Sequence, residues 1–476
     1  MTSKYTRRQY LALAAIGAAS TAGCFSDSNG DGGTTTTTAT PTATPDPSQM
    51  PAVHWLSDYN NDRWQQKWDQ LSASFTDETG IETDIEFVGG SGEGEKRLAN
   101  LIQAGNPPDL MTTTHESVAN LWSQDKLQPT TDLVDEIASA AGEPSIDLQK
   151  DEQGNVYQVP HGYYVSTYIY RTDVYEELGL SEPGSYADIL ENARAIDESD
   201  QIDARGFMLP AAKNAPLSEG VFRHLLNNKG YAYVQWKSDA EEEVELWIPK
   251  EPAVEVLNFM NELAQYSPSP SQNTFVTGLT DWGAGAFAQQ INLNAWPAAV
   301  ATQVDPSVAT TTGATNVPLQ DGVSKEEVPV TLEPDGHFIL RNGENTPGAR
   351  RFLLWLYGRN AETAAEMYAQ EPMRFLPTYE KILDTDTFSN LGYFEQFPGH
   401  LELLEEIKVI GDEYFSNNKS AQRAIRQGPA SYLRGGFFLA NMVHDVVVVD
   451  MDPGAAYDKW RTNMEDRLEE GKRRFG

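Results

Sequence analysis

The chain alternates between strand-like and helix-like patterns after residue 52, and this alternation constrains the fold more than any other feature. Residues 53–56 (VHWL) form a short apolar run typical of a buried strand, and residues 81–88 (IETDIEFV) alternate as a half-buried strand does. Between them, large apolar side chains recur at helical spacing, at Trp64, Trp68, Leu71 and Phe75. A second helical pattern at 96–104 and a strand at 109–111 follow. This order predicts an α/β fold with a parallel sheet covered on both faces.

Acidic residues outnumber basic ones two to one. The chain has 70 Asp and Glu against 35 Lys and Arg, which gives a formal net charge of −35. Such a surface lacks the basic face that a nucleic-acid-binding protein needs to displace counterions from phosphates. It stays hydrated when salt screens its self-repulsion, and it resembles the surfaces of haloarchaeal proteins. The composition therefore predicts a halophilic protein that does not bind nucleic acid.

Residues 1–23 read as an export signal. Arg7 and Arg8 belong to a segment, TRRQYL, that resembles the twin-arginine export motif. The apolar run that follows, residues 11–19, is too short to span a bilayer. The signal ends in Thr-Ala-Gly before Cys24, which is the only cysteine of the chain and stands where a lipoprotein cysteine receives its lipid. These features predict a protein anchored by lipid to the extracellular face of the cell membrane.

Residues 24–50 separate this anchor from the apolar-rich part of the chain. Eight of the twelve residues at 34–45 are Thr, and Pro is interspersed. Such a segment has almost nothing to bury, so we expect a disordered tether.

Motifs of catalysis, metal binding or nucleotide binding do not occur in the sequence. There is no His-Glu-x-x-His, no Gly-x-Ser-x-Gly and no cysteine pair, and the seven histidines are scattered singly. The glycine-rich turn at 89–96 (GGSGEGEK) lies where a phosphate loop would, but Glu95 stands where either phosphate-binding pattern needs Gly. We therefore expect no enzyme, no cofactor and no metal.

Several longer segments keep a recognisable order from Val53 to about Arg474. They are WQQKWDQLSASFTDETGIETDIEF, LANLIQAGNPPDLM, GNVYQVPHGYYVSTYIYRTDVYEELGL, WGAGAFAQQINLNAWP and GARRFLLWLYGRNAETAAEMYAQEPMRFLPT. In this order they resemble the family 1 extracellular solute-binding proteins, the maltose-binding-protein-like receptors of ABC importers.

The resemblance implies a two-lobe periplasmic-binding-protein-like (type II) fold with a ligand cleft between the lobes. The chain would cross between lobes three times, near 160–163, 330–337 and 374–377. One lobe would then comprise 51–161 plus 336–375. The other would comprise 162–335 plus 376–476. Closure of the hinge would trap the solute.

The resemblance also implies ligand contacts, and stacked rings with planar hydrogen-bonding groups suit a sugar. The candidates are Asp58, Tyr59, Asn60, Asn61, Thr113, Thr114, His115, Tyr163, Tyr164, Trp282, Trp296 and Tyr432. Each has a structural alternative. The residues at 57–62 suit a helix N-cap, the two tyrosines suit strand packing, and Trp282 suits the core or the rim. Arg374 suits either an anion site or a structural ion pair.

These features together predict the solute-binding receptor of an ABC importer. It would capture a mono- or oligosaccharide as a monomer and deliver it to a membrane permease that works with an ATPase. Receptors for a glycerol phosphodiester, a polyamine or a metal ion are alternatives. A tethered surface hydrolase is a further alternative from a different class.

Overall fold

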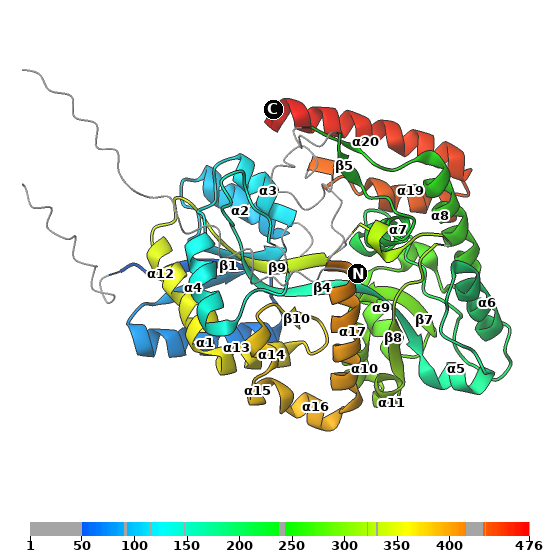
Figure 1. Cartoon of the computed structure of the whole chain (residues 1–476), viewed down its shortest axis with the longest axis horizontal. Coiled ribbons are helices and arrows are strands. Elements are labelled where there is room, and N and C mark those ends of the chain that lie inside the picture. The colour runs from blue at the N-terminus through cyan, green and yellow to red at the C-terminus, as the bar shows by residue number, and fades with distance from the viewer. Residues whose placement is uncertain are drawn as a thin grey trace, which may run out of the picture. The chain divides into compact units, whose positions relative to one another are not determined.

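A computed structural model describes residues 50–475 except for 90–92, 115, 147, 238–242, 321, 330–331, 416–431 and 434 (Figure 1). The predicted export signal with Arg7 and Arg8, the lipidation candidate Cys24, most of the predicted tether and His115 therefore lie outside the described residues. Within the described part, no helix has both the length and the apolar character needed to cross a membrane.

The first strand–helix–strand unit forms as the sequence predicts. Strand β1 (Val53–Ser57) pairs in parallel with β2 (Thr83–Phe87), and α1 (Asp62–Thr79) connects them. The side chains at helical spacing are all buried, namely Trp64, Trp68, Leu71 and Phe75. Helix α1 ends at Gly80, whose φ of 75° is readily adopted by glycine.

The remaining elements follow in chain order. The other strands are β3 (Leu110–Thr114), β4 (Val159–Arg171), β5 (Val234–Trp236), β6 (Val244–Leu246), β7 (Gln289–Leu293), β8 (Thr312–Thr315), β9 (Leu332–Ile339) and β10 (Leu376–Pro377). The helices up to the third predicted crossing are α2 (Glu93–Gln103), α3 (Glu116–Ser123), α4 (Thr131–Ala141), α5 (Thr172–Leu178), α6 (Tyr186–Asp197), α7 (Pro216–Asn227), α8 (Lys250–Leu263), α9 (Phe275–Gly283), α10 (Trp296–Val304), α11 (Pro306–Thr310), α12 (Thr346–Leu353) and α13 (Ala361–Met367). After it come α14 (Glu380–Leu383), α15 (Asp386–Ser389), α16 (Gly392–Gln396), α17 (Gly399–Phe415), α19 (Phe438–Val447) and α20 (Pro453–Phe475).

The main sheet is mixed rather than wholly parallel. Its strand order is β10-β4-β9-β3-β1-β2. The predicted parallel arrangement holds for β1 with β2 and for β1 with β3. From β9 onward the pairing is antiparallel, because β9 runs against both β3 and β4 and β10 runs against β4. The first three strands gave no information about this half of the sheet, because it is built from later parts of the chain.

Strand β4 is shared between two groups of strands. Its first half, residues 159–165, pairs with β9, and Gly162 and Tyr163 also pair with β10. Its second half, residues 166–171, pairs with β7 and β8. The three predicted crossings thus fall on β4, on β9, and on β10 with the residues just before it. In the sheet these three strands are neighbours, in the order β10-β4-β9.

Strand β4 is irregular around Gly162, where the segment that leads into β10 packs against it. The register with β9 shifts between Pro160 and Gly162. A Cβ atom at Gly162 would lie 2.9 Å from the Phe375 Cβ and 3.1 Å from the Leu376 carbonyl oxygen. Only glycine therefore allows the segment before β10 to lie this close to β4.

Candidate functional site

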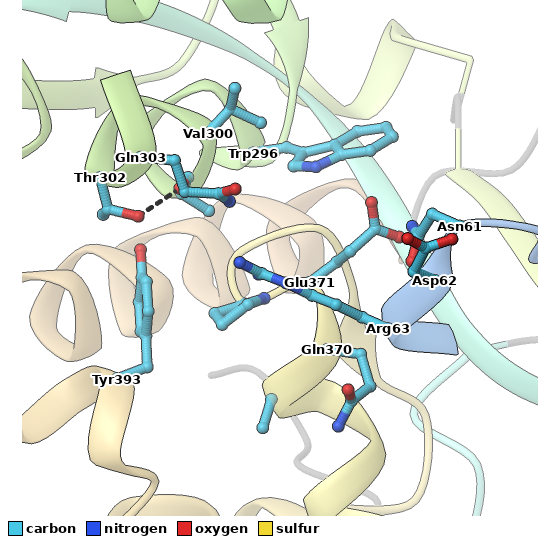
Figure 2. A pocket seen from close by; sticks show the side chains of 13 residues that line it. Asn61, Asp62, Arg63, Trp296, Val300, Thr302, Gln303, Gln370, Glu371 and Tyr393 are labelled. Atoms are coloured by element: carbon cyan, nitrogen blue, oxygen red, sulfur yellow. Dashed lines mark hydrogen bonds between the residues drawn. The ribbon is translucent and has the colours of Figure 1, made fainter. Parts of the chain in front are cut away.

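A cavity of about 550 Å³ lies among four segments of the chain (Figure 2). Its lining residues come from the start of α1, from α10, from the turn before β10 and from α16. They are Asn61, Asp62, Arg63, Trp296, Ala299, Val300, Thr302, Gln303, Ala369, Gln370, Glu371, Pro372 and Tyr393. The volume is within the usual range of small-molecule sites, roughly 300–1,000 Å³.

The N-terminus of α1 forms one wall. The Asn61 side-chain oxygen accepts a hydrogen bond from the Trp64 backbone N–H at 3.1 Å, as an N-cap residue does. The bond commits that oxygen and leaves the amide NH₂ of Asn61 available as a donor. The N-cap reading and the ligand-contact reading of this segment are therefore compatible, because each uses a different end of the same amide.

Helix α10 forms the opposite wall. Trp296 is its first residue, and Pro297 follows at a position where a missing N–H costs nothing. The Trp296 ring is half-buried and lies 5.0 Å from the Phe275 ring, centroid to centroid. It thus offers the cavity part of a flat apolar surface held in place by packing.

Arg374 lies between aromatic rings behind the cavity. Its guanidinium carbon is 4.5 Å from the centroid of Trp296, 4.6 Å from that of Phe375 and 5.2 Å from that of Tyr59. The guanidinium also pairs with the Glu371 carboxylate. The structural reading of Arg374 as an ion-paired residue therefore holds in the structure. The cation is neutralised by a side chain that lines the cavity.

Glu371 is held on two sides. Its Oε2 atom accepts a hydrogen bond from the Trp64 indole N–H at 2.6 Å as well as the contact from Arg374. Its side chain is 17% exposed. The carboxylate is thereby fixed in orientation at the rim of the cavity.

Asp335 on β9 connects the loop after β1 to the shared strand. Its Oδ2 atom accepts hydrogen bonds from the Tyr59 hydroxyl at 3.0 Å and from the Tyr164 hydroxyl at 2.9 Å. Arg374 in turn donates from Nε to the Tyr164 oxygen at 3.1 Å. Burial raises the pKa of both tyrosines well above the ordinary value, so both hydroxyls stay protonated and can donate.

Asp58 is a second acid next to this group, and its side chain is largely but not fully buried. The Thr113 hydroxyl donates to its Oδ2 at 2.9 Å, and its Oδ1 is buried without a hydrogen-bond partner among the described residues. Burial, followed by the nearby charge of Asp335, raises the pKa of Asp58 from 3.8 to about 7. Near neutral pH this group can therefore exist in either protonation state.

The structure brings six of the twelve candidates together. Asn61 and Trp296 line the cavity. The four others lie behind it and are linked through Asp335 and Arg374, namely Asp58, Tyr59, Thr113 and Tyr164. The neighbouring Asn60 is exposed, and its backbone carbonyl accepts from the Gln65 side chain at 2.7 Å.

Besides Tyr59 and Tyr164, three aromatic candidates do not line the cavity. Tyr163 is fully buried and pairs with Leu376 in the sheet. Trp282 is also fully buried, and its indole N–H donates to the Thr312 hydroxyl at 3.0 Å. Of the alternatives given for Trp282, the structure therefore supports a position in the core. Tyr432 donates to Glu470 at 3.1 Å, with Arg467 over its ring at 3.6 Å. Of the remaining candidates, Thr114 belongs to β3 and His115 lies outside the described residues.

Several lining residues were missed by the sequence reading. Those on α10 carried a usable signal, because Ala299, Val300 and Gln303 follow Trp296 at the three-, four- and seven-residue spacing that places side chains on one helix face. Glu371 and Tyr393 carried none, because each reaches the cavity only through tertiary packing. Within the described ranges, no group of three or more His, Cys, Asp or Glu is arranged to hold a metal ion.

Comparison with known proteins finds solute-binding proteins. A protein of Escherichia coli K12 named as an ABC transporter periplasmic-binding protein, YcjN, is 21% identical over 388 residues, covering 79% of this chain and 83% of the relative. A solute-binding protein of Agrobacterium radiobacter K84 in complex with ribitol superimposes with a TM-score of 0.68 at 18% identity, over 87% of this chain and 98% of that one.

Two further solved structures are similar. The GacH receptor of Streptomyces glaucescens, solved unliganded and with acarbose, has a TM-score of 0.67 at 15% identity over 88% of this chain and 99% of that one. A sugar transporter protein of Arthrobacter chlorophenolicus A6 with bound laminaribiose has a TM-score of 0.66 at 15% identity over 87% and 99%. These superpositions confirm the predicted two-lobe α/β fold class. The model of the bacterial extracellular solute-binding protein family matches residues 58–362, and the chain belongs to that family.

Proposed function

We propose that this protein is the substrate-binding receptor of an ABC importer and that its solute is a sugar or a polyol. Family membership and the name of the Escherichia coli relative support the receptor role. The similar structures bound to ribitol, acarbose and laminaribiose support the solute class.

The observation that carries the proposal is the cavity at Trp296. A sugar or polyol has apolar C–H faces and a dense set of hydroxyls. The cavity offers the Trp296 ring for the former, and for the latter the side chains of Asn61, Gln303, Gln370 and Glu371. Its volume of about 550 Å³ suits a small saccharide.

The charges around the cavity disfavour the phosphodiester alternative. Asp62 and Glu371 face it together with Arg63, and Arg374 behind it is already paired with Glu371. A phosphate group needs uncompensated basic donors. Among the side chains that line this cavity, two are acidic and one is basic.

We propose the lobe division that the sequence predicts, 51–161 plus 336–375 for one lobe and 162–335 plus 376–476 for the other. The adjacency of β4, β9 and β10 supports this division, because a hinge of three neighbouring strands lets two bodies rotate with small changes in each strand. The solute would be held between Asn61 from the first lobe and Trp296 from the second.

The proposed location follows from the N-terminal sequence. The receptor would be exported through the twin-arginine motif with Arg7 and Arg8. It would be anchored by lipid on Cys24 and held off the membrane by the tether at 24–50. There it would work as a halophilic monomer that hands its solute to the permease and takes part in no catalysis of its own.

A binding screen tests the proposal. Ribitol, D-mannitol, laminaribiose, glycerol 3-phosphate and spermidine are each titrated into the protein in high salt, by calorimetry and by melting curve. A sugar or polyol should raise the melting temperature, because it binds the folded state only. Small-angle scattering with that solute should show a smaller radius of gyration. Binding of only the phosphate ester or only the polyamine would contradict the solute class.

A further inference from the structure

The cavity wall at Tyr393 has a fixed hydrogen-bond direction. The Tyr393 hydroxyl lies 2.5 Å from Nδ1 of His400, and Nε2 of His400 lies 2.8 Å from the Ala309 carbonyl oxygen. A carbonyl can only accept, so the His400 proton must be on Nε2. In the neutral ring Nδ1 is then an acceptor, and the proton between His400 and Tyr393 must be the one on the Tyr393 hydroxyl.

His400 is in surroundings that keep it neutral. The side chain is 3% exposed and stacks against the Phe397 ring at 5.3 Å. Burial lowers the pKa of His400 below its ordinary value. With its single proton directed to Ala309, the ring holds the Tyr393 proton away from the cavity.

The hydroxyl of Thr302, on the opposite wall, also donates its proton to a group of the protein. Its hydroxyl donates to the Ala299 carbonyl at 2.7 Å, so its proton too is bound within the protein. In Figure 2 the oxygen atoms of Thr302 and Tyr393 point toward one another at one end of the cavity. We call these two hydroxyl oxygens the acceptor end.

We infer that Tyr393 is a specificity-determining residue that accepts a hydrogen bond from a hydroxyl of the solute, and that His400 is the positioning residue that fixes this direction. The inference rests on the proposed function, since it assigns the acceptor end to the same solute. A group that can only accept, such as an ether oxygen or a fluorine, leaves the acceptors of Tyr393 and Thr302 unpaired and is rejected.

One measurement tests the direction without any solute. The full chain is labelled with ¹⁵N-histidine, and the His400 ring signals are assigned by their loss in His400→Gln. Near neutral pH, His400 should be the neutral tautomer with its proton on Nε2. A proton on Nδ1, alone or together with one on Nε2, would overturn the inference, because Tyr393 would then receive rather than donate that proton.

A second measurement tests the specificity. The probe that binds best among ribitol, D-mannitol and laminaribiose is compared by calorimetry with its monofluoro analogues, each with one hydroxyl replaced by fluorine. At one position the replacement should weaken binding to the parent protein roughly ten- to hundredfold, because fluorine cannot donate. In Tyr393→Phe and in Thr302→Val this discrimination should shrink.

The control is Tyr266→Phe, which removes the same hydroxyl from a half-buried tyrosine that does not line the cavity. It should keep the full discrimination, and melting curves confirm that each variant folds. Equal discrimination in parent and Tyr393→Phe would overturn the inference while leaving the receptor role intact. Binding of none of the three probes would contradict the proposed function, and the tautomer measurement would still decide the direction at Tyr393.

Discussion

The guanidinium group of Arg374 lies over the indole ring of Trp296, with its central carbon 4.5 Å from the ring centroid. Arg374 belongs to the first predicted lobe and Trp296 to the second, so the contact joins the two. A cation over an aromatic face contributes about 0.5–2 kcal/mol, depending on its exposure to water. The same ring lines the cavity, so the residue that we propose to contact the solute also takes part in the contact between the predicted lobes.

Trp296→Ala should weaken solute binding roughly ten- to hundredfold, because stacking on an aromatic ring contributes about 1–3 kcal/mol. The matched change is Trp282→Ala, which removes a fully buried indole from the core. It should lower the free energy of unfolding by about 3–5 kcal/mol. Calorimetry and urea unfolding on both variants check this. Unaltered affinity in Trp296→Ala would remove that residue from the site.

Glu371→Gln should lower stability by about 1–3 kcal/mol, because it leaves the largely buried Arg374 without its carboxylate partner. Glu366→Gln is the control. Glu366 also pairs with a cation, Lys67 at 2.7 Å, but it is 54% exposed, so the loss should stay below about 1 kcal/mol. Equal losses in urea unfolding would contradict the role assigned to the Glu371–Arg374 pair.

Asp58 should make the protein less stable as the pH rises from about 4 to about 7. Its pKa is raised to about 7 in the folded protein, from 3.8, so within this window the folded state holds a proton that the unfolded state has released. Stability is therefore highest at the acid end of the window and falls by up to about 4 kcal/mol across it, at about 1.4 kcal/mol per pKa unit.

The test for this prediction is urea unfolding at several pH values with Asp58→Asn. The variant cannot ionise, so its stability should fall less between the two limits than that of the parent. Asp62→Asn, at an exposed position four residues away, should follow the parent curve. Parallel curves for parent and Asp58→Asn would refute the assignment to Asp58.

Salt withdrawal should destabilise the fold, because 70 acidic residues against 35 basic ones repel one another when unscreened. The melting temperature followed by circular dichroism should fall from molar to millimolar KCl. An unchanged melting temperature would contradict the prediction that the protein is halophilic, and it would not bear on the proposed receptor role.

Cys24→Ser should release the protein into the medium or block its processing, because no other thiol is present in the sequence to receive a lipid. Washed membranes and medium are compared by immunoblot. A variant retained on the membrane as fully as the parent would contradict the lipid anchor. Replacement of Arg7 and Arg8 by Lys tests the export route separately, and undiminished surface protein would argue for another pathway.

Local patterns were sufficient to predict the first part of the fold. The helical spacing from Trp64 to Phe75 and the stop at Gly80 depend on neighbouring residues alone, and the structure has both. The antiparallel half of the sheet could not be predicted in this way. The pairing of β10 with Gly162 and Tyr163 joins positions more than two hundred residues apart. The three predicted crossings came from the order of the segments that resemble the family, and not from local patterns.

The candidate site was predicted to a similar extent. Asn61 was a candidate because it follows the first strand, where the family resemblance implies ligand contacts, and Trp296 because it matches a tryptophan of the family pattern. The structure places both at the start of a helix. Residue type alone offers no way to distinguish Trp282 from Trp296, because both are tryptophans of the same segment. Only the tertiary packing shows that Trp282 lies in the core and Trp296 at the cavity. Tyr393 gave no signal, because the role that we propose for it depends on His400 and, through His400, on the carbonyl of Ala309 from a distant part of the chain.

Strand β4 also bears on how the protein unfolds. Its 13 residues are a pairing partner of β9 and β10 at one end and of β7 and β8 at the other. If one end of the strand unfolds, its buried backbone N–H and C=O groups lose their hydrogen-bond partners. The other end is then no longer held at the junction, so we expect a half-unfolded intermediate to be unstable. Two lobes with separate strands would melt in two steps, whereas we expect the predicted lobes, which share β4, to melt in one cooperative transition.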